Sequence, residues 1–349
     1  MEMREGGQQR QCAGAVCFAV LLAVFPAQAK QGLLDGLDLC YTVLVPSLFP
    51  FLFVADYLWA LLRPAFQKSR PLCLCLCVLF SLCGGFPMGA KVLSQAEAMG
   101  FLNKKQASLL LAGCVNAGPA YLISGVGVSL FGSARAGIYL FISLSLASLT
   151  TLAGIFLFYR RDFRRCGASP AAFSGNAPAS FAGSLAGAVR ATAGLCAYVV
   201  LFSCAGSLFF HLLKLLRIQS VFVRWLFTAL CEVSSACAFS ADVGSILGLY
   251  LALACVSLCG VSVLLQVRAL TQQSGLSLRP LLCVRPVHLL LSSCILHLLL
   301  SGTDSTPVLA QGASVAARLF CVSPAFSFFL FLLSVIFVGG KKKLPLFTN

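Results

Sequence analysis

The chain has 349 residues, of which 59% are hydrophobic and only 10% are charged. Soluble domains carry roughly 25% charged residues, so the composition excludes an ordinary soluble protein and indicates an integral membrane protein. The net charge of +15 does not indicate nucleic-acid binding, because the basic residues lie in short loops between apolar segments, as the positive-inside rule describes. The lipid bilayer is therefore the first partner that we expect.

The first 30 residues allow two interpretations. Arg4 and Arg10 precede an apolar run from Cys12 to Pro26. This pattern is typical of a cleaved signal peptide or of an uncleaved transmembrane helix that acts as a signal anchor. We favour the uncleaved helix.

Apolar segments recur along the rest of the chain at the length of about 20 residues that a spanning helix needs. A basic, Gly/Ser/Pro/Ala-rich loop at 160–182 separates two halves, 31–159 and 183–300, and a last segment, 301–349, ends in Lys341–Lys343. The pattern predicts spanning helices at 11–29, 39–62, 106–130, 136–158, 184–213, 243–265, 281–300 and 319–338, and interrupted apolar segments at 71–90 and 219–240.

The charged residues test whether the two interrupted segments cross the membrane. If both cross, the basic clusters at 63–70 and 160–165 fall on opposite sides. If both are re-entrant hairpins, these clusters share the cytoplasmic side with the C-terminus, as the positive-inside rule requires. We therefore predict an all-α polytopic membrane protein with about eight spanning helices and two re-entrant hairpins. The hairpins then enter from opposite sides, which is the inverted-repeat layout of many secondary transporters.

The first interrupted segment contains a cluster of residues that break a helix. Non-helical backbone at membrane depth survives only where protein buries it or where it lines a polar cavity, so we expect this cluster to form one wall of a substrate site. Lys91 either attracts an anionic substrate or extends to the cytoplasmic interface. The candidate substrate-binding residues in this segment are Gly84, Gly85, Pro87, Gly89 and Lys91.

Three polar residues in other apolar segments complete the predicted site. Glu232 is costly at mid-membrane, so it either binds a substrate or coupling ion or lies at a hairpin tip near water. Asn116 stands before Pro119, which frees a backbone carbonyl, and it either contacts a ligand or packs between helices. Gln266 either contacts a ligand or marks a membrane boundary. Asp56 lies near Trp59, a typical interface residue, so we leave it outside the site.

The sequence gives no sign of a metal site, a cofactor or an enzyme. Most of the 18 cysteines lie inside apolar segments and no C-x-x-C pair occurs, so we interpret them as small apolar residues. The three histidines lie on separate segments without metal-ligand spacing, and no nucleotide-binding or hydrolase motif is present. We predict no cofactor, no metal and no catalytic residue.

Five motifs occur in the order seen in a known family. The motifs are Pro46–Phe51, Gly85–Lys91, Asn116–Pro119, Glu232-Val-Ser and Gly260–Val267. With this ordered set, the chain resembles the YlbJ-type sporulation integral membrane proteins, which contain the nucleoside-transporter-like Gate domain, over roughly residues 10–300.

The resemblance implies two Gate-like repeats, one in 31–159 and one in 183–300, and a role in endospore formation. It implies transport of a small polar or anionic metabolite, with dipicolinate as the leading candidate and a nucleoside-like solute as another. The protein would lie in the cell membrane, or in the membrane that surrounds the forespore. The alternatives are a non-transporting scaffold for spore-envelope or cortex assembly and a cation-permeation subunit, which the scarcity of acidic residues disfavours. A homo-oligomer is left open.

Overall fold

The computed structural model describes residues 2–66, 70–164, 180–218 and 220–301, and its secondary structure in these ranges is entirely helical. The predicted helix at 319–338, the tail Lys341–Lys343 and most of the loop 160–182 lie outside the described residues. By length and composition, five helical runs among the described residues could cross a membrane, which confirms the helical membrane class: Pro26–Leu62, Ala134–Phe158, Phe181–Leu215, Ile246–Thr271 and Arg279–Ser301.

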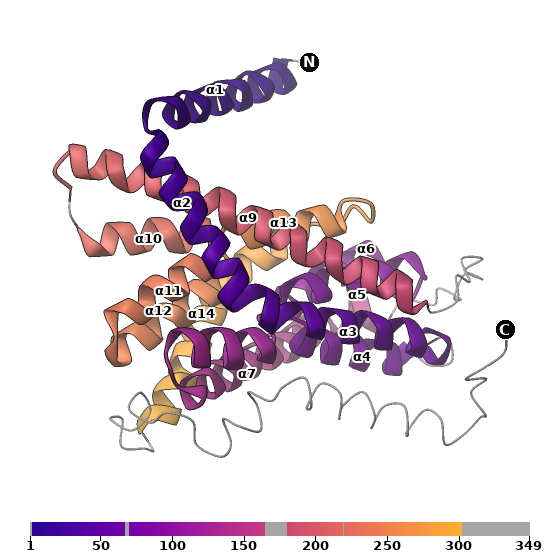
Figure 1. Ribbon diagram of the computed structural model, residues 1–349. Helices are drawn as coiled ribbons and strands as arrows, with labels where there is room; N and C mark the ends of the chain where they lie inside the picture. The colour runs from indigo at the N-terminus through magenta and orange to yellow at the C-terminus, as the bar shows by residue number, and fades with distance from the viewer. Residues whose placement is uncertain (1, 67–69, 165–179, 219, 302–349) are drawn as a thin grey trace.

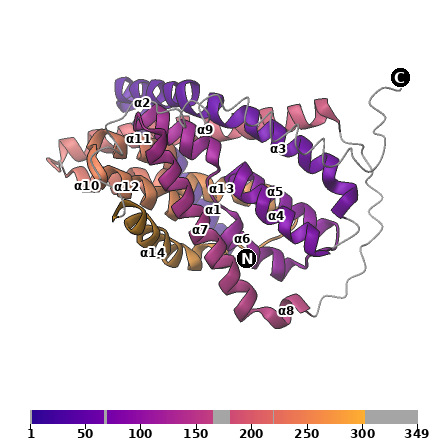
Figure 2. The same ribbon diagram turned by 90° about the horizontal axis from the view of Figure 1, so that it is seen from below.

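Two long helices lie side by side along one face of the molecule (Figures 1 and 2). One is the continuous run of α2 (Pro26–Leu39), η1 (Cys40–Leu44) and α3 (Val45–Phe66), and the other is α9 (Phe181–Leu215). We call them the flanking pair. Gly32 and Gly36 permit this contact, because a Cβ on Gly32 would lie 2.7 Å from the Ser203 carbonyl oxygen. Small residues four apart are typical of close contacts between membrane helices.

The N-terminal helix does not continue into the flanking pair. Helix α1 (Glu2–Val24) ends before Phe25, and α2 begins at Pro26. Proline is favoured in the first turn of a helix because its missing N–H group has no intrahelical partner there. The chain changes direction at this point, and α1 projects away from the body of the molecule (Figure 1). The predicted helix at 11–29 is therefore divided between α1 and α2.

In the first half, two short helices form a hairpin. Helix α4 (Arg70–Gly84) and α5 (Phe86–Ala98) pack against each other and are joined at Gly85, whose φ of +79° favours glycine. The 15 residues of α4 extend about 22 Å, less than the roughly 30 Å of a hydrocarbon core. Helices α6 (Lys104–Cys114), η2 (Ala120–Leu130), α7 (Ala134–Phe158) and α8 (Arg160–Arg164) follow.

The second half contains a similar series of short helices. Helices α10 (Val221–Cys231) and α11 (Val233–Val243) have 11 residues each, pack against each other and meet at Glu232. Helices α12 (Ser245–Leu258), α13 (Val261–Thr271) and α14 (Arg279–Ser301) follow. The interrupted segments expected at 71–90 and 219–240 are thus both pairs of short helices.

Two helices that we predicted to be continuous, 106–130 and 243–265, are each interrupted in the structure, so that part of the prediction is wrong. The predicted helix at 106–130 stops at Cys114, and residues 115–118 are not helical. Pro119 explains this break, since the residue before a proline is disfavoured in the helical conformation. The predicted helix at 243–265 is broken after Leu258, where Cys259 has the left-handed φ of 60° and ψ of 50° and Gly260 follows.

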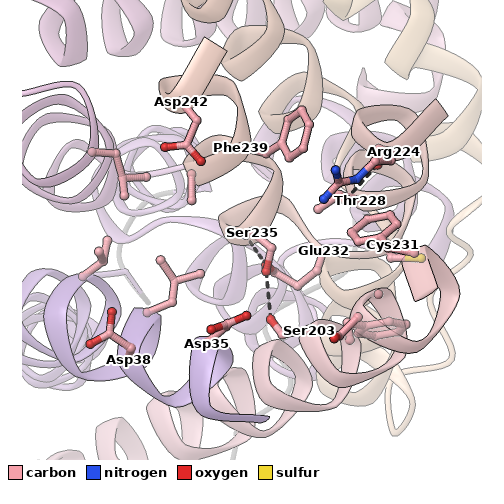
Figure 3. Close-up of a pocket in the computed structure, with 18 of the residues that line it drawn as sticks. Asp35, Asp38, Ser203, Arg224, Thr228, Cys231, Glu232, Ser235, Phe239 and Asp242 are labelled. Carbon is pink, nitrogen blue, oxygen red and sulfur yellow. Dashed lines mark hydrogen bonds between the residues drawn. The ribbon is translucent and has the colours of Figure 1, made fainter. Parts of the chain in front are cut away.

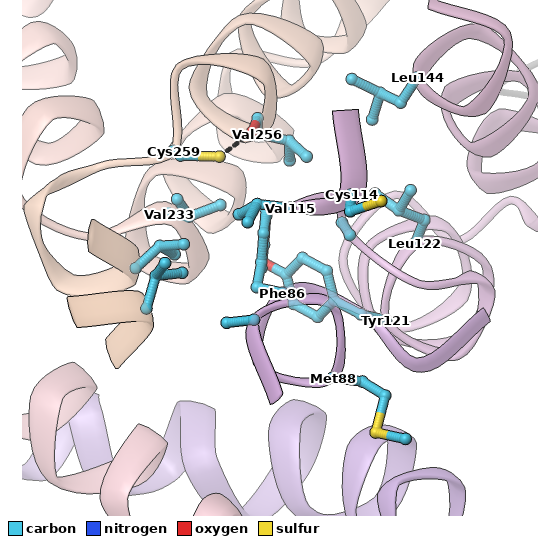
Figure 4. Packing of buried hydrophobic residues seen from close by; sticks show 14 of the residues in the cluster. Phe86, Met88, Cys114, Val115, Tyr121, Leu122, Leu144, Val233, Val256 and Cys259 are labelled. Carbon is cyan, nitrogen blue, oxygen red and sulfur yellow. Dashed lines mark hydrogen bonds between the residues drawn. The ribbon is translucent and has the colours of Figure 1, made fainter. Parts of the chain in front are cut away.

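Each half of the chain contains two breaks between helices, and within each half these two breaks lie against each other. A Cβ on Gly85 would lie 3.3 Å from the backbone nitrogen of Gly118, so the break of the α4–α5 hairpin touches the break after α6. A Cβ on Gly260 would lie 3.3 Å from the Cys231 carbonyl oxygen, so the break after α12 touches the break of the α10–α11 hairpin. Buried residues beside these breaks, among them Phe86, Val115 and Val233, pack in one core (Figure 4).

Candidate functional site

Three cavities follow one another along the flanking pair. The first, which we call the acidic cavity, has a volume of about 680 Å³ and includes Asp35, Asp38 and Asp242. The central cavity has a volume of about 30 Å³, roughly the space that one water molecule takes in the liquid. The lysine cavity has a volume of about 270 Å³ and includes Lys91.

Residues of the chain breaks separate these cavities. Glu232, between α10 and α11, lines both the acidic and the central cavity. Pro87, in the first turn of α5, lines both the central and the lysine cavity. The first helix of the flanking pair passes all three in chain order, since Asp38 lines the acidic, Leu44 the central and Asp56 the lysine cavity. A narrow point at the centre therefore lies between two wider cavities.

The acidic cavity brings charged residues from both sides together (Figure 3). Asp35 and Asp38 come from α2, whereas Arg224, Glu232 and Asp242 come from the α10–α11 hairpin. Four carboxylates and one guanidinium line this cavity. It is bridged where the Ser203 hydroxyl of α9 lies 3.0 Å from the Ser235 hydroxyl of α11. The described residues contain no group of three or more His, Cys, Asp or Glu residues arranged to hold a metal ion.

Glu232 has a structural role that its sequence context did not reveal. Its carboxylate accepts hydrogen bonds from the backbone N–H groups of Ser234, at 2.9 Å, and Ser235, at 2.5 Å. Glu232 is thus the N-cap of α11 and satisfies two donors that a helix leaves unpaired at its start. The side chain is 3% exposed. The carboxylate holds the tip of the hairpin and lies between two cavities at the same time.

The central cavity combines apolar walls with a few polar groups. Tyr121 is buried and its hydroxyl has no hydrogen-bond partner among the described residues. Gln266 of α13, 9% exposed, lines the same cavity. Leu48 and Leu195 of the flanking pair close it from the other side. Apolar walls with a few placed polar groups are typical of small-molecule sites.

The lysine cavity contains an ion pair that the sequence did not predict. The Lys91 ammonium of α5 donates a hydrogen bond to the Asp56 carboxylate of α3. Gly187 of α9 lies close enough that a Cβ there would be 2.9 Å from Asp56 Oδ2. Arg190 also lines the cavity. The lysine cavity, with two cations and one carboxylate, therefore has a net positive charge, whereas the acidic cavity has a net negative charge.

The structure brings half of the predicted site residues to the central cavity. Gly85, Pro87, Glu232 and Gln266 line it, and Lys91 lies in the lysine cavity instead.

The remaining three predicted residues do not line any of the three cavities. Gly84 and Gly89 permit close packing, since a Cβ on Gly89 would lie 1.9 Å from the Cys114 carbonyl oxygen. Asn116 is 1% exposed, and neither its amide nitrogen nor its amide oxygen has a hydrogen-bond partner in the described structure.

Sequence reasoning missed several residues of this region. Tyr121 gave no signal, because an aromatic residue in an apolar run is ordinary. Arg285, a buried residue of α14 outside the three cavities, gave a clear signal, since a charged residue inside an apolar run marks a functional region by default. Asp56 and Lys91 are 35 residues apart, and their pairing depends on the packing of α3 against α5.

Comparison of the chain with protein-family models, with curated proteins and with solved structures gives no match in any of the three. The fold and its cavities define a helical membrane protein with interrupted helices around a closed centre.

Proposed function

We propose that the protein is a membrane transporter that moves a small polar or anionic metabolite through the central cavity. The observation that carries this proposal is the series of three cavities, in which Glu232 separates the first two and Pro87 the last two. Transporters place their substrates where interrupted helices meet near the middle of the bilayer. The central cavity is closed here, so transport requires that the hairpins move relative to the flanking pair.

The proposed topology follows from the two hairpins. In it, α4–α5 enters the bilayer from the cytoplasmic side and α10–α11 from the outside, as two Gate-like inverted repeats among about eight spanning helices. The short hairpin helices and the basic clusters at 63–70 and 160–165 support this arrangement. The acidic cavity then opens outward and the lysine cavity toward the cytoplasm.

The charges of the cavities bear on the solute. Lys91 and Arg190 would attract an anion to the lysine cavity, whereas the four carboxylates of the acidic cavity would repel one. Dipicolinate, the solute suggested by resemblance to the YlbJ-type sporulation proteins, therefore suits the lysine cavity as its point of entry. A nucleoside-like solute would depend instead on hydrogen bonds from Tyr121 and Gln266.

Uptake by the purified protein in sealed lipid vesicles tests the proposal. Labelled dipicolinate and a labelled nucleoside are offered separately, and protein-free vesicles give the background. Saturable uptake of either solute supports transport, and its absence for both solutes contradicts the proposal for these substrates. In a spore-forming cell, deletion of the gene should lower the dipicolinate content of spores. A deletion that leaves dipicolinate unchanged but impairs the spore envelope would favour the scaffold alternative.

A further inference from the structure

Arg285 of α14 binds two interrupted helices at once. Its Nη1 donates a hydrogen bond to the Ser257 carbonyl oxygen at 3.2 Å, close to the end of α12, and its Nη2 donates to the Val115 carbonyl oxygen at the end of α6. The side chain is 3% exposed. A single guanidinium therefore joins the chain breaks of the two halves.

The chemistry of the helix ends explains how a buried cation is tolerated there. The described residues place no carboxylate within ion-pair distance of Arg285. The last carbonyl groups of a helix lack intrahelical partners, and each helix C-terminus carries a partial charge of about −0.5. Two such ends together offset about one positive charge. The planar guanidinium can reach two acceptors at fixed angles, which a lysine ammonium does not reproduce.

The position of Arg285 affects the wall of the central cavity. The Val115 carbonyl and the Asn116 N–H belong to one planar peptide unit, so binding the former fixes the start of the non-helical segment. Ala117 and Gly118, the next residues, line the central cavity. Arg285 thus acts on the cavity through the backbone, without touching it.

A second buried residue of α14 provides a comparison. His288 lies one turn further along, with Nδ1 2.7 Å from the Ser257 hydroxyl and Nε2 3.0 Å from the Ser148 hydroxyl of α7. Its two ring nitrogens thus contact α12, the second interrupted helix, and α7 rather than α6. His288 therefore contacts one chain break, whereas Arg285 contacts both. Variants of the two residues can thus be compared to test the effect of linking the breaks.

We propose that Arg285 is a positioning residue of the transport site, which fixes the chain breaks of α6 and α12 relative to each other. Helices α6, α12 and α14 are then held together as one body. The role in transport rests on the proposed function, whereas the link between the two breaks stands independently of it.

Hydrogen–deuterium exchange of the full-length protein in lipid nanodiscs tests the link. In Arg285→Met, which keeps an apolar side chain of similar length, amide exchange should accelerate about tenfold or more at both 111–118 and 255–262. In His288→Leu, exchange should accelerate at 255–262 and around Ser148 of α7, but not at 111–118. Unchanged exchange at 111–118 in Arg285→Met would overturn the proposal. A uniform acceleration over all helices would also overturn it, because that result indicates general instability.

A conservative variant covers the case in which Arg285→Met fails to fold. Arg285→Lys keeps the charge but loses the two-pronged geometry, so at least one of the two segments should exchange faster, and full protection at both would contradict the proposal. Dipicolinate uptake by Arg285→Lys should show a raised KM with a smaller change in kcat. If the wild-type protein takes up no dipicolinate, the proposed function fails for this solute while the exchange result still decides the link.

Discussion

Lys91 and Asp56 form an ion pair that joins the α4–α5 hairpin to the flanking pair at the lysine cavity. One turn further along both helices, the Trp59 indole N–H donates a hydrogen bond to the Gln95 side-chain oxygen. Both links connect α3 to α5. They hold the hairpin in the position in which the central cavity is closed.

The first prediction concerns this ion pair. The side chains of Lys91 and Asp56 are 32% and 14% exposed, so each single variant, Lys91→Met or Asp56→Leu, leaves a poorly solvated charge unpaired. We expect each to destabilise the protein more than the double variant does, with a coupling free energy of about 0.5–3 kcal/mol. Thermal unfolding of the four proteins in nanodiscs measures it.

The pair formed by Lys105 and Asp162 serves as the control for that cycle. Its side chains are 61% and 35% exposed, and the two atoms lie 3.0 Å apart. Because water screens exposed pairs, Lys105→Met should change stability by less than about 1 kcal/mol. Equal effects at both pairs would show that the Lys91–Asp56 contact has no special role.

The second prediction separates the two roles of Glu232. Glu232→Ala removes the N-cap of α11 and should cost about 0.5–2 kcal/mol of stability. Glu232→Ser removes the carboxylate but supplies a hydroxyl that caps a helix, so its stability should stay close to that of the wild-type protein. If the carboxylate takes part in transport, both variants lose uptake. Normal uptake by Glu232→Ser would restrict Glu232 to its structural role.

The third prediction concerns close packing at Gly89. A Cβ there would lie 1.9 Å from the Cys114 carbonyl oxygen, which is backbone and has little freedom to move. Gly89→Ala should therefore push α5 away from the end of α6 and cost about 1–3 kcal/mol or more.

Gly154→Ala in α7 is the matched change, because no atom lies within 4 Å of an added Cβ there. It should be neutral or stabilise the helix by up to about 1 kcal/mol. Unfolding midpoints of the two variants compare them directly, and equal midpoints would contradict the close packing at Gly89.

The fourth prediction concerns the sides to which the cavities open. Cys231 lines the acidic cavity, and Ala191 lines the lysine cavity. A membrane-impermeant thiol reagent added outside intact cells should label Cys231 but not a cysteine introduced by Ala191→Cys. Inside-out vesicles should show the reverse. Site-resolved mass spectrometry measures the labelling, with buried Cys77 as an unreactive reference. Labelling of both from one side would contradict the proposed path.

Features set by the local chain were predictable from the sequence. The membrane class and the interrupted segments at 71–90 and 219–240 follow from composition, apolar run length and charge, and glycines and a proline mark the break at Gly85. No glycine or proline marks the break at Glu232. The breaks at Gly118–Pro119 and Gly260 were also visible as glycine and proline. They were missed because continuous apolar character suggested uninterrupted helices.

Long-range contacts were not predictable in the same way. The Gly32–Gly36 spacing marks a contact face, but the sequence does not say that α9 fills it. Asn116 was expected in the site on chemical grounds, yet the backbone turns its neighbours Ala117 and Gly118 into the central cavity instead.

A helical membrane protein with two interrupted segments is encoded locally, because hydropathy and helix breaking depend on residues close together in the chain. Three contacts emerge only from the folded chain: Lys91 pairs with Asp56, Glu232 caps α11 between two cavities, and Arg285 joins α6 to α12. These contacts depend on how helices far apart in the chain pack, and the pattern of apolar residues constrains that packing only weakly.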